Sequence, residues 1–253
     1  MTIAWITGGG TGIGRALAES LYRDGARVVI SGRRPDVLEA AARDISSHPG
    51  GEVLPIAGNA ADPAHIAGVI LRVKEKWGPV DLLINNAGAN TNHAFDQSPP
   101  AEYEEVFINN TLSAIRATQA VLPDMLVARK GAIVNISSIY GLMASGRSAS
   151  YTVSKHALSG YTEVLRQGVE GTGVHVLGVY PGFIRTAMTL PFVRTGSIRS
   201  YLGKSPEALA EAIRQALRKK KRHLYYPWYV PWALRLNRWM PGLTELLAQK
   251  VKR

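Results

Sequence analysis

Tyr151 and Lys155 have the types and the spacing of a proton-transfer pair. On a helix, side chains four residues apart share one face. A phenol with its ordinary pKa of about 10 is a poor base at neutral pH, and a neighbouring ammonium group lowers that pKa by favouring the phenolate. Such a pair could serve as general acid and base. Taken alone, a tyrosine and a lysine at this spacing more often lie on a solvated helix face.

A glycine-rich turn near the amino terminus has the composition of a phosphate-binding loop. Residues 7–14, TGGGTGIG, lie between a short apolar run and a helical pattern. Glycines let a phosphate approach the backbone N–H groups at a helix N-terminus and permit positive φ. The spacing differs from the common G-x-G-x-x-G, and an ordinary strand–helix connection is the alternative. The strand–turn–helix context favours a dinucleotide site.

The elements that must position these residues alternate along the chain. Apolar runs predict strands at residues 3–7, 27–31, 52–57, 80–85, 131–137 and 174–180. Helical patterns lie at residues 14–24, 36–46, 63–77, 100–128 and 149–170, with a further helix at 205–220 and a short strand at 223–226. Strands that are apolar throughout are buried on both faces. We therefore predict an α/β, single-domain Rossmann fold with a doubly wound parallel sheet.

Five motifs follow one another in a fixed order over about residues 1–220. They are Thr7-Gly8-x-x-x-Gly12-Ile13-Gly14, Asn85-Asn86-Ala87-Gly88, Asn110, Ser138 with Tyr151-x-x-x-Lys155, and Pro181-Gly182-x-x-x-Thr186. Together they resemble the short-chain dehydrogenase/reductase family of the Tyr-x-x-x-Lys type. The C-terminal region is similar, more weakly, to the branch with lipophilic substrates, the 11β-hydroxysteroid dehydrogenase-like and 3-ketosphinganine reductase-like enzymes.

The resemblance implies an enzyme that interconverts a carbonyl and a secondary alcohol by hydride transfer. Tyr151 would give a proton to the carbonyl oxygen in reduction and take one in oxidation, and Ser138 would stabilise charge on that oxygen. Lys155 and the nicotinamide cation would lower the Tyr151 pKa, and Lys155 would hold the nicotinamide ribose. Asn110 would anchor a water leading from Lys155 to solvent; it is preferred to Asn109 because it lies thirteen residues before Pro123.

The expected cofactor is NADP(H) in preference to NAD(H). An NAD site usually carries an acid at the end of the second strand, where this chain has Ser31 followed by Arg33 and Arg34. Arg33, assisted by Ser31, could bind a 2′-phosphate, although such arginines are most often solvated. Asn59 stands where the family often has an aspartate against adenine. The expected cofactor contacts are Thr7, Gly8, Gly10, Thr11, Gly12, Ile13, Gly14, Ser31, Arg33, Arg34, Asn59, Ala60, Asn86, Ala87, Gly88, Tyr151, Lys155, Pro181, Gly182, Ile184 and Thr186.

The segment 187–204 has no clean periodicity and follows the expected core, residues 1–186. We expect it to close a substrate pocket together with residues 142–148 and 90–93, where His93 is expected to be a surface side chain. The expected lining is Ser138, Tyr140, Met143, Tyr151, Met188 and Phe192. This largely apolar set favours a lipophilic ketone, such as a 3-oxoacyl lipid, a sterol, or a long-chain or polyketide ketone.

The C-terminal region is basic and aromatic. Residues 205–226 would end the core and 227–253 would form an extension, helical over about 232–247. Residues 218–253 contain ten basic residues and one acid, whereas the whole chain carries +11. Trp228, Trp232 and Trp239 interleave with arginines, so the region either touches a membrane surface or packs on the core or on a second subunit. No nucleic-acid-binding motif accompanies it, and we expect no such partner.

Composition narrows the function further. The chain has no cysteine and no histidine pair with zinc spacing, so we expect neither disulfides nor a metal site. Neither a secretory signal nor an apolar run long enough to span a membrane is visible, which favours a cytoplasmic enzyme. The resemblance implies a homodimer or homotetramer formed through the helices that begin near Pro100 and Ala149. An alcohol dehydrogenase acting mainly in oxidation and a non-catalytic cofactor-binding regulatory protein stay open as alternatives.

Overall fold

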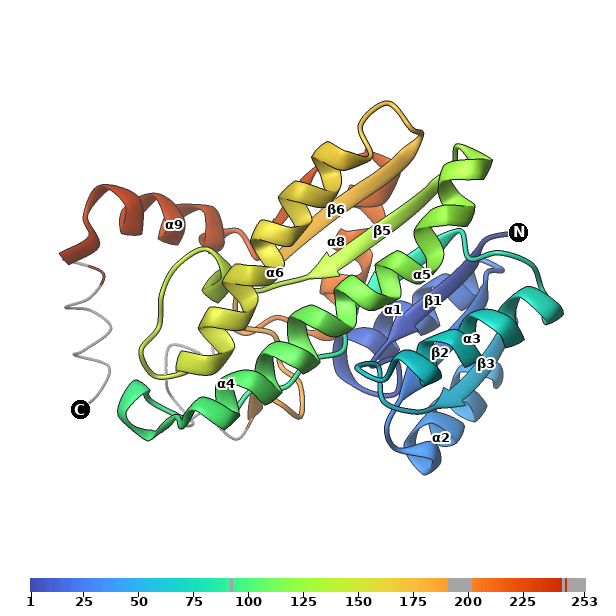
Figure 1. The fold of residues 1–253 in the computed structure, drawn as a ribbon, viewed down its shortest axis with the longest axis horizontal. Coiled ribbons are helices and arrows are strands. Elements are labelled where there is room, and N and C mark those ends of the chain that lie inside the picture. Colours follow the sequence, from blue (N-terminus) through green and yellow to red (C-terminus); the bar gives the residue numbers. More distant parts are fainter. Residues whose placement is uncertain (92, 191–201, 243, 245–253) are drawn as a thin grey trace.

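The computed structural model describes residues 1–91, 93–190, 202–242 and 244 (Figure 1). Its centre is a seven-stranded sheet in the order β3-β2-β1-β4-β5-β6-β7, and all neighbouring strands are parallel. The strands are β1 Ile3–Thr7, β2 Arg27–Gly32, β3 Glu52–Ala57, β4 Leu82–Asn85, β5 Gly131–Ile136, β6 Val174–Pro181 and β7 His223–Tyr226. This topology confirms the predicted Rossmann fold. The strand order reverses between β1 and β4, where such sheets bind ligands.

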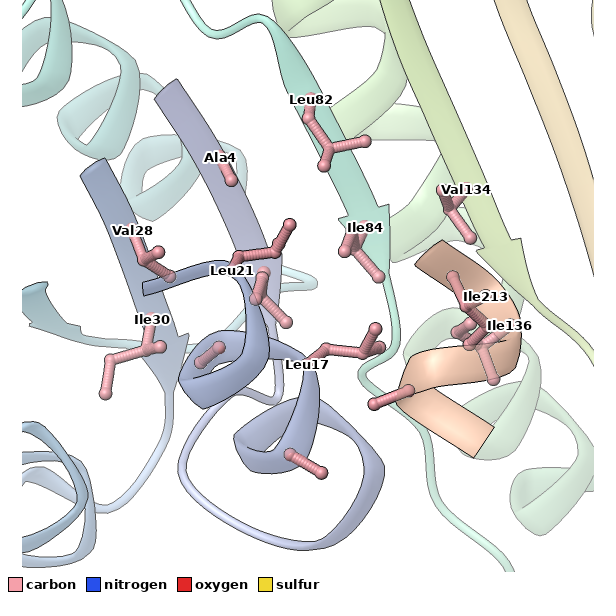
Figure 2. Close-up of a cluster of buried hydrophobic side chains, with 14 of the residues drawn as sticks. Ala4, Leu17, Leu21, Val28, Ile30, Leu82, Ile84, Val134, Ile136 and Ile213 are labelled. Carbon is pink, nitrogen blue, oxygen red and sulfur yellow. The ribbon is translucent and has the colours of Figure 1, made fainter. Parts of the chain in front are cut away.

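Helices cover both faces of the sheet. They are α1 Gly12–Arg23, α2 Pro35–Ser46, α3 Pro63–Lys76, α4 Pro100–Phe107, α5 Ser113–Ala128, α6 Ala149–Gly168, α8 Pro206–Arg218 and α9 Tyr229–Trp239. One buried cluster packs α1, α2 and α8 on the sheet, and a second packs α3, α5 and α6 on the opposite face. Figure 2 shows Leu17 and Leu21 of α1 and Ile213 of α8 in the first cluster, beside strand side chains such as Ile84.

Alternation along the strands explains why they are apolar throughout. In β1, Ala4 and Ile6 belong to the first cluster, while Ile3 and Trp5 belong to the second. Successive side chains of a strand point to opposite faces, and both faces are covered by helices. The same alternation determines which residue at a strand end can face the functional site.

The helix predicted over residues 100–128 has an interruption. Between α4 and α5 the chain forms a π-helical turn, Ile108–Leu112, which contains Asn110. Single π turns within α-helices often occur at functional sites. Short 3-10 turns at Phe95–Gln97 and Ile139–Gly141 were likewise absent from the sequence prediction.

The C-terminal helix is shorter than its apolar spacing suggested. The helix α9 ends at Trp239, and Met240 has φ −138° and ψ 64°, outside the helical region. Pro241 follows, and the residue before a proline is sterically disfavoured in the α conformation. The helical spacing predicted over about 232–247 is therefore interrupted at Met240, and the chain is helical again at Pro241, Gly242 and Thr244. Residues 191–201, which include Phe192, and residues 243 and 245–253 lie outside the described residues.

Candidate active site

A cleft of about 310 Å³ lies at the carboxyl ends of the central strands. It is formed by the loops that follow β1 to β6, at the reversal of strand order. Most of the sequence-predicted cofactor residues line it: Gly8, Gly10, Thr11, Gly12, Ile13, Arg33, Arg34, Asn59, Ala60, Asn86, Ala87, Gly88, Tyr151, Lys155, Pro181, Gly182, Ile184 and Thr186. Thr7, Gly14 and Ser31 are outside this lining.

The glycine-rich turn has a geometry that larger residues would not allow. Gly8 and Gly12 have φ of 67° and 54°, which favours glycine. A Cβ at Gly14 would collide with the carbonyl oxygen of Gly8 and lie 2.5 Å from Nδ2 of Asn86. Gly14 therefore lets α1 start directly against the turn, and the cleft wall is left as bare backbone able to meet a pyrophosphate.

Thr7 holds this turn in place through hydrogen bonds of its side chain. Its side chain is buried, and Oγ1 accepts hydrogen bonds of 3.0 Å from the backbone N–H groups of both Asn86 and Ala87. Nδ2 of Asn86 in turn donates to the carbonyl oxygens of Thr7 and Gly8, at 3.0 and 3.1 Å. The turns after β1 and β4 are thereby tied together, so Thr7 positions the cleft wall and does not line it.

Ser31 is a correction to the sequence prediction. Its side chain is fully buried, and Oγ accepts a 2.9 Å hydrogen bond from Nε1 of Trp5 inside the second core cluster. The prediction that its hydroxyl assists in phosphate binding is wrong, because side chains alternate along a strand and Ser31 faces the core. The next residue, Gly32, lines the cleft beside Arg33 and Arg34. No acid is found among the cleft-lining residues within the described part of the chain.

The three expected catalytic side chains come together from β5 and α6. Ser138 follows β5 and caps the turn Ile139–Gly141, with Oγ accepting from the N–H of Tyr140 at 3.1 Å. Ser138 also hydrogen-bonds Tyr151. Nζ of Lys155 donates to the carbonyl oxygen of Ile136 at 2.8 Å and lies 5.7 Å from the centroid of the Tyr151 ring.

Burial shifts the proton affinities of the two ionisable members. It raises the pKa of Tyr151 to about 12, although the hydrogen bond from Ser138 acts in the opposite direction. It lowers the pKa of Lys155 to about 8. In the protein alone, burial therefore dominates the Tyr151 pKa, and the expected lowering by Lys155 is not among its causes. The phenol is protonated near neutral pH and can donate a proton.

Asn110 lies in the π-helical turn and is buried. Nδ2 of Asn110 donates to the carbonyl oxygen of Ala89 at 3.0 Å and to Oγ of Ser154 at 2.9 Å. Oδ1 of Asn110 accepts from the backbone N–H of Ala89 at 2.6 Å. A Cβ added to Gly88 would lie 3.1 Å from Oδ1 of Asn110 and 3.7 Å from Nζ of Lys155. Asn110 and the head of Lys155 thus both approach Gly88. The rejected neighbour, Asn109, instead forms part of the cleft wall.

Glu102 was missed by sequence reasoning. Its carboxylate accepts hydrogen bonds from Thr91 and Ser150, both 2.7 Å, and from Nδ1 of His93 at 2.5 Å. Burial opposes its ionisation, yet these bonds and one from Ser98 lower its pKa to about 2. Glu102 thereby joins the loop after β4 to the start of α6, beside Tyr151. A single acid in a helix gives no sequence signal for this role. The His93 side chain is exposed, as expected, but it is paired.

A second cavity, of about 590 Å³, adjoins the cleft and shares Ser138 and Tyr151 with it. This volume suits a small-molecule site. Of the expected substrate residues, Tyr140, Met143 and Met188 also line it, and Phe192 lies outside the described residues. The segments expected to close the pocket also contribute Asn90, Ser145, Arg147, Ser148, Thr189 and Leu202. The lining that the sequence did not lead us to expect is Ile139, Gly182, Phe183, Tyr229 and Ala233.

Tyr229 and Ala233 were missed because they come from α9, far along the chain from the catalytic motif. Oη of Tyr229 accepts a 2.8 Å hydrogen bond from the backbone N–H of Phe183, so α9 is attached to the segment that follows β6. Across the described ranges, no group of three His, Asp or Glu side chains is arranged to hold a metal ion.

The chain belongs to the short-chain dehydrogenase family, whose model, described as short chain dehydrogenase, matches residues 2–195. The 3-oxoacyl-[acyl-carrier-protein] reductase FabG of Escherichia coli is 35% identical over 187 residues, which cover 74% of this chain and 75% of that protein. Dehydrogenase/reductase SDR family member 7B of Bos taurus is 32% identical over 220 residues, or 82% and 68% of the two chains.

Solved structures show the same fold. A short-chain dehydrogenase from Sphingobium yanoikuyae in complex with NADPH matches with a TM-score of 0.82 and 25% identity over 98% of this chain and 96% of that one. L-sorbose reductase from Gluconobacter frateurii, complexed with NADPH and L-sorbose, matches with a TM-score of 0.80 and 27% identity over 88% and 94%. The chain is accordingly an oxidoreductase acting on CH–OH and C=O groups.

Proposed function

We propose that this protein is an NADP(H)-dependent reductase of a lipophilic ketone. The observation that carries the proposal is the position of Ser138 and Tyr151, which line both the glycine-walled cleft and the neighbouring cavity. A hydride donor in the first and a carbonyl in the second would meet at these two hydroxyl groups. The protonated state of Tyr151 supports the reductive direction.

The cleft fits a nicotinamide dinucleotide by its chemistry. The positive φ angles of Gly8 and Gly12 and the close approach at Gly14 leave backbone N–H groups uncovered for a pyrophosphate. Asn59 and Ala60 would border the adenine, and Pro181, Ile184 and Thr186 the nicotinamide. When bound, the cofactor supplies a hydride to the carbonyl carbon.

The protein supplies the matching proton. The Tyr151 hydroxyl would donate it to the carbonyl oxygen, so that C=O, a hydride and a proton give CH–OH. Ser138 would hydrogen-bond the same oxygen as negative charge develops there. Lys155 would bind the nicotinamide ribose and favour the phenolate that remains. Asn110, which like the lysine head approaches Gly88, would hold a water through which the phenolate regains a proton.

Selectivity for NADP(H) is proposed from charge. Arg33 and Arg34 line the cleft, both are exposed, and none of the ion pairs found in the described ranges involves them. A 2′-phosphate would meet a guanidinium and no carboxylate, which favours it over a bare ribose hydroxyl. Two of the similar proteins were solved in complex with NADPH, which is compatible with the same cofactor here.

A lipophilic substrate is proposed from the lining of the second cavity. Ile139, Met143, Phe183, Met188 and Leu202 provide apolar walls around the two hydroxyl groups. The relative from Escherichia coli carries the name of a 3-oxoacyl reductase, which is compatible with a ketone on an acyl chain. An enzyme working mainly in oxidation would use the same residues in reverse.

The test measures NADPH oxidation by the purified protein against ketones graded from short and polar to long and lipophilic. We expect turnover to rise with chain length and to disappear in Tyr151→Phe. Equal catalytic efficiency with NADH and NADPH would contradict the cofactor preference. Bound NADPH with no turnover of any ketone or alcohol would favour the regulatory alternative.

We also propose a homo-oligomer built through α4 to α6. Large apolar side chains are exposed on these helices, among them Val127 on α5 and Val153 and Val164 on α6. Light scattering after size exclusion should give a mass at least twice that of the chain, and Val164→Lys should reduce it. A monomer at micromolar concentration would contradict this proposal.

A further inference from the structure

The helix α9 presents a row of indole side chains to solvent. Trp228, Trp232 and Trp239 are 69%, 62% and 82% exposed. Trp228 directly precedes α9 and lies four residues before Trp232, and the three share one face with Leu236 by helical spacing. Figure 1 shows α9 extending outward from the body of the fold. Large exposed apolar patches of this kind mark interaction sites.

The opposite face of the same helix belongs to the substrate site. Val230 is fully buried, and Tyr229 and Ala233 line the second cavity. The hydrogen bond from Phe183 to Tyr229 holds this face to the chain that follows β6. A partner bound to the tryptophan face would therefore be separated from the substrate cavity by the width of a single helix.

Positive charge surrounds the tryptophans. The guanidinium of Arg235 lies 5.1 Å from the centroid of the Trp232 ring, and Arg238 is exposed on the next turn. Residues 218–242 contain seven basic residues and no acid. Ion pairs in the described ranges involve Arg218 and Arg222 but neither Arg235 nor Arg238. A partner for this face should therefore be anionic as well as apolar.

We propose that α9 docks on the surface of a bilayer that contains anionic lipid. Tryptophan is stable at headgroup depth, where its ring contacts hydrocarbon and its N–H stays hydrated, and nearby arginines attract anionic headgroups. A second copy of this chain would carry the same positive charge and would be repelled at an isologous contact. No helix among the described residues is long and apolar enough to cross a membrane.

Docking of α9 would place one wall of the substrate cavity at the lipid surface. This consequence rests on the proposed reduction of a lipophilic ketone, whereas the docking itself does not. A ketone dissolved in the bilayer would then reach the Tyr151 hydroxyl without crossing bulk water. Reduction of such a ketone should be faster on anionic vesicles than in detergent-free buffer, and reduction of a short water-soluble ketone should not depend on vesicles.

The test is co-sedimentation of the full chain with vesicles of phosphatidylcholine alone or mixed with phosphatidylglycerol. We expect binding to the mixed vesicles and a loss of about tenfold or more in the triple variant Trp228→Ser/Trp232→Ser/Trp239→Ser, because three interfacial side chains are removed. The matched control is Leu71→Ser, which removes an exposed apolar side chain from α3, a helix with no part in either proposed interface. Brominated lipid should quench the fluorescence of the wild type more than that of the triple variant.

Charge gives a second, milder variant. Arg235→Gln/Arg238→Gln should weaken binding to the mixed vesicles severalfold and remove the advantage of phosphatidylglycerol. Equal binding by the wild type and the triple variant, or none by the wild type, would overturn the proposal. A further result would also overturn it: the wild type does not bind vesicles, and the triple variant has a lower mass than the wild type in light scattering. The tryptophan face would then join two copies of the chain.

The two proposals fail separately. Reduction of a short soluble ketone reports on the catalytic function in every variant, because Trp228, Trp232 and Trp239 lie outside both cavity linings. A protein that binds vesicles and reduces no ketone would contradict the proposed function alone. A protein that reduces ketones but ignores vesicles would contradict the docking alone.

Discussion

The cofactor cleft and the substrate cavity meet at Ser138 and Tyr151 but are built in different ways. The cleft is formed largely by backbone at the ends of parallel strands, held by the buried sheet and by hydrogen bonds such as those of Thr7. The cavity is formed by side chains from loops and from α9, an element attached at the far end of the chain. The cleft therefore depends on the sheet itself, whereas the cavity depends largely on loop and helix side chains, the parts of a fold that usually vary most between related proteins.

Their charges differ as well. The cleft contains Lys155, Arg33 and Arg34 and no acid among its described lining, which suits a polyanionic cofactor. The cavity has one charged residue in its described lining, Arg147, among mostly apolar and hydroxyl side chains. Single substitutions should therefore impair cofactor binding in the cleft without impairing substrate binding in the cavity, or the reverse.

After Tyr151→Phe, which should abolish turnover, Ser138→Ala should show the largest effect. Loss of the hydroxyl removes the donor that stabilises charge on the carbonyl oxygen, and kcat should fall by about 10²–10³. NADPH should still bind, because the cleft keeps its backbone walls. Kinetics together with fluorescence titration of NADPH would measure both. A parallel loss of NADPH affinity would show that the two regions are not separable.

Gly14→Ala should damage the cleft and the fold together. The new methyl group would collide with the carbonyl oxygen of Gly8, and we expect a loss of about 1–3 kcal/mol in the free energy of unfolding. NADPH affinity should fall in the same variant. Gly68→Ala is the matched control, since a Cβ there meets nothing within 4 Å. Because alanine is the better helix former, the control should be stabilised by up to about 1 kcal/mol. Equal denaturation midpoints for the two variants would contradict this account.

Arg33→Ala should affect the cleft selectively. If its guanidinium binds the 2′-phosphate, KM for NADPH should rise by about 10- to 100-fold, the range of a charge-assisted hydrogen bond. KM for NADH, which lacks that phosphate, should change little. Arg43→Ala, on the following helix α2, is the control because its side chain is exposed outside the cleft. An equal change for both cofactors would assign Arg33 a different role.

The pH profile should report on Lys155. Burial disfavours its ammonium and lowers the pKa to about 8, whereas Tyr151 holds its proton up to about 12. The positive charge is complete below pH 8 and is lost as the pH rises through that value. Above it, kcat/KM for reduction should therefore fall by up to about tenfold per pH unit. A profile that is flat up to pH 10 would show that the charge of Lys155 is not needed.

Most of the cleft lining could be predicted because its signals are local. Gly8 and Asn86 each follow a strand directly, Pro181 ends one, and parallel strands bring their carboxyl ends to one edge of the sheet. Tyr151 and Lys155 share a helix face by their spacing alone. The error at Ser31 arose at a strand end, where a shift of one residue exchanges the core face for the cleft face.

The amino-acid sequence by itself determined the fold, the cofactor turn and the positions of Ser138, Tyr151 and Lys155, because strand periodicity, helix spacing and glycine turns act over short windows. Only the tertiary structure decided that Ser31 bonds Trp5, that Glu102 joins the loop after β4 to the start of α6, and that α9 forms a wall of the substrate cavity. These contacts join residues far apart in the chain, and which side chains meet depends on how whole elements pack. A short stretch of sequence does not determine that packing.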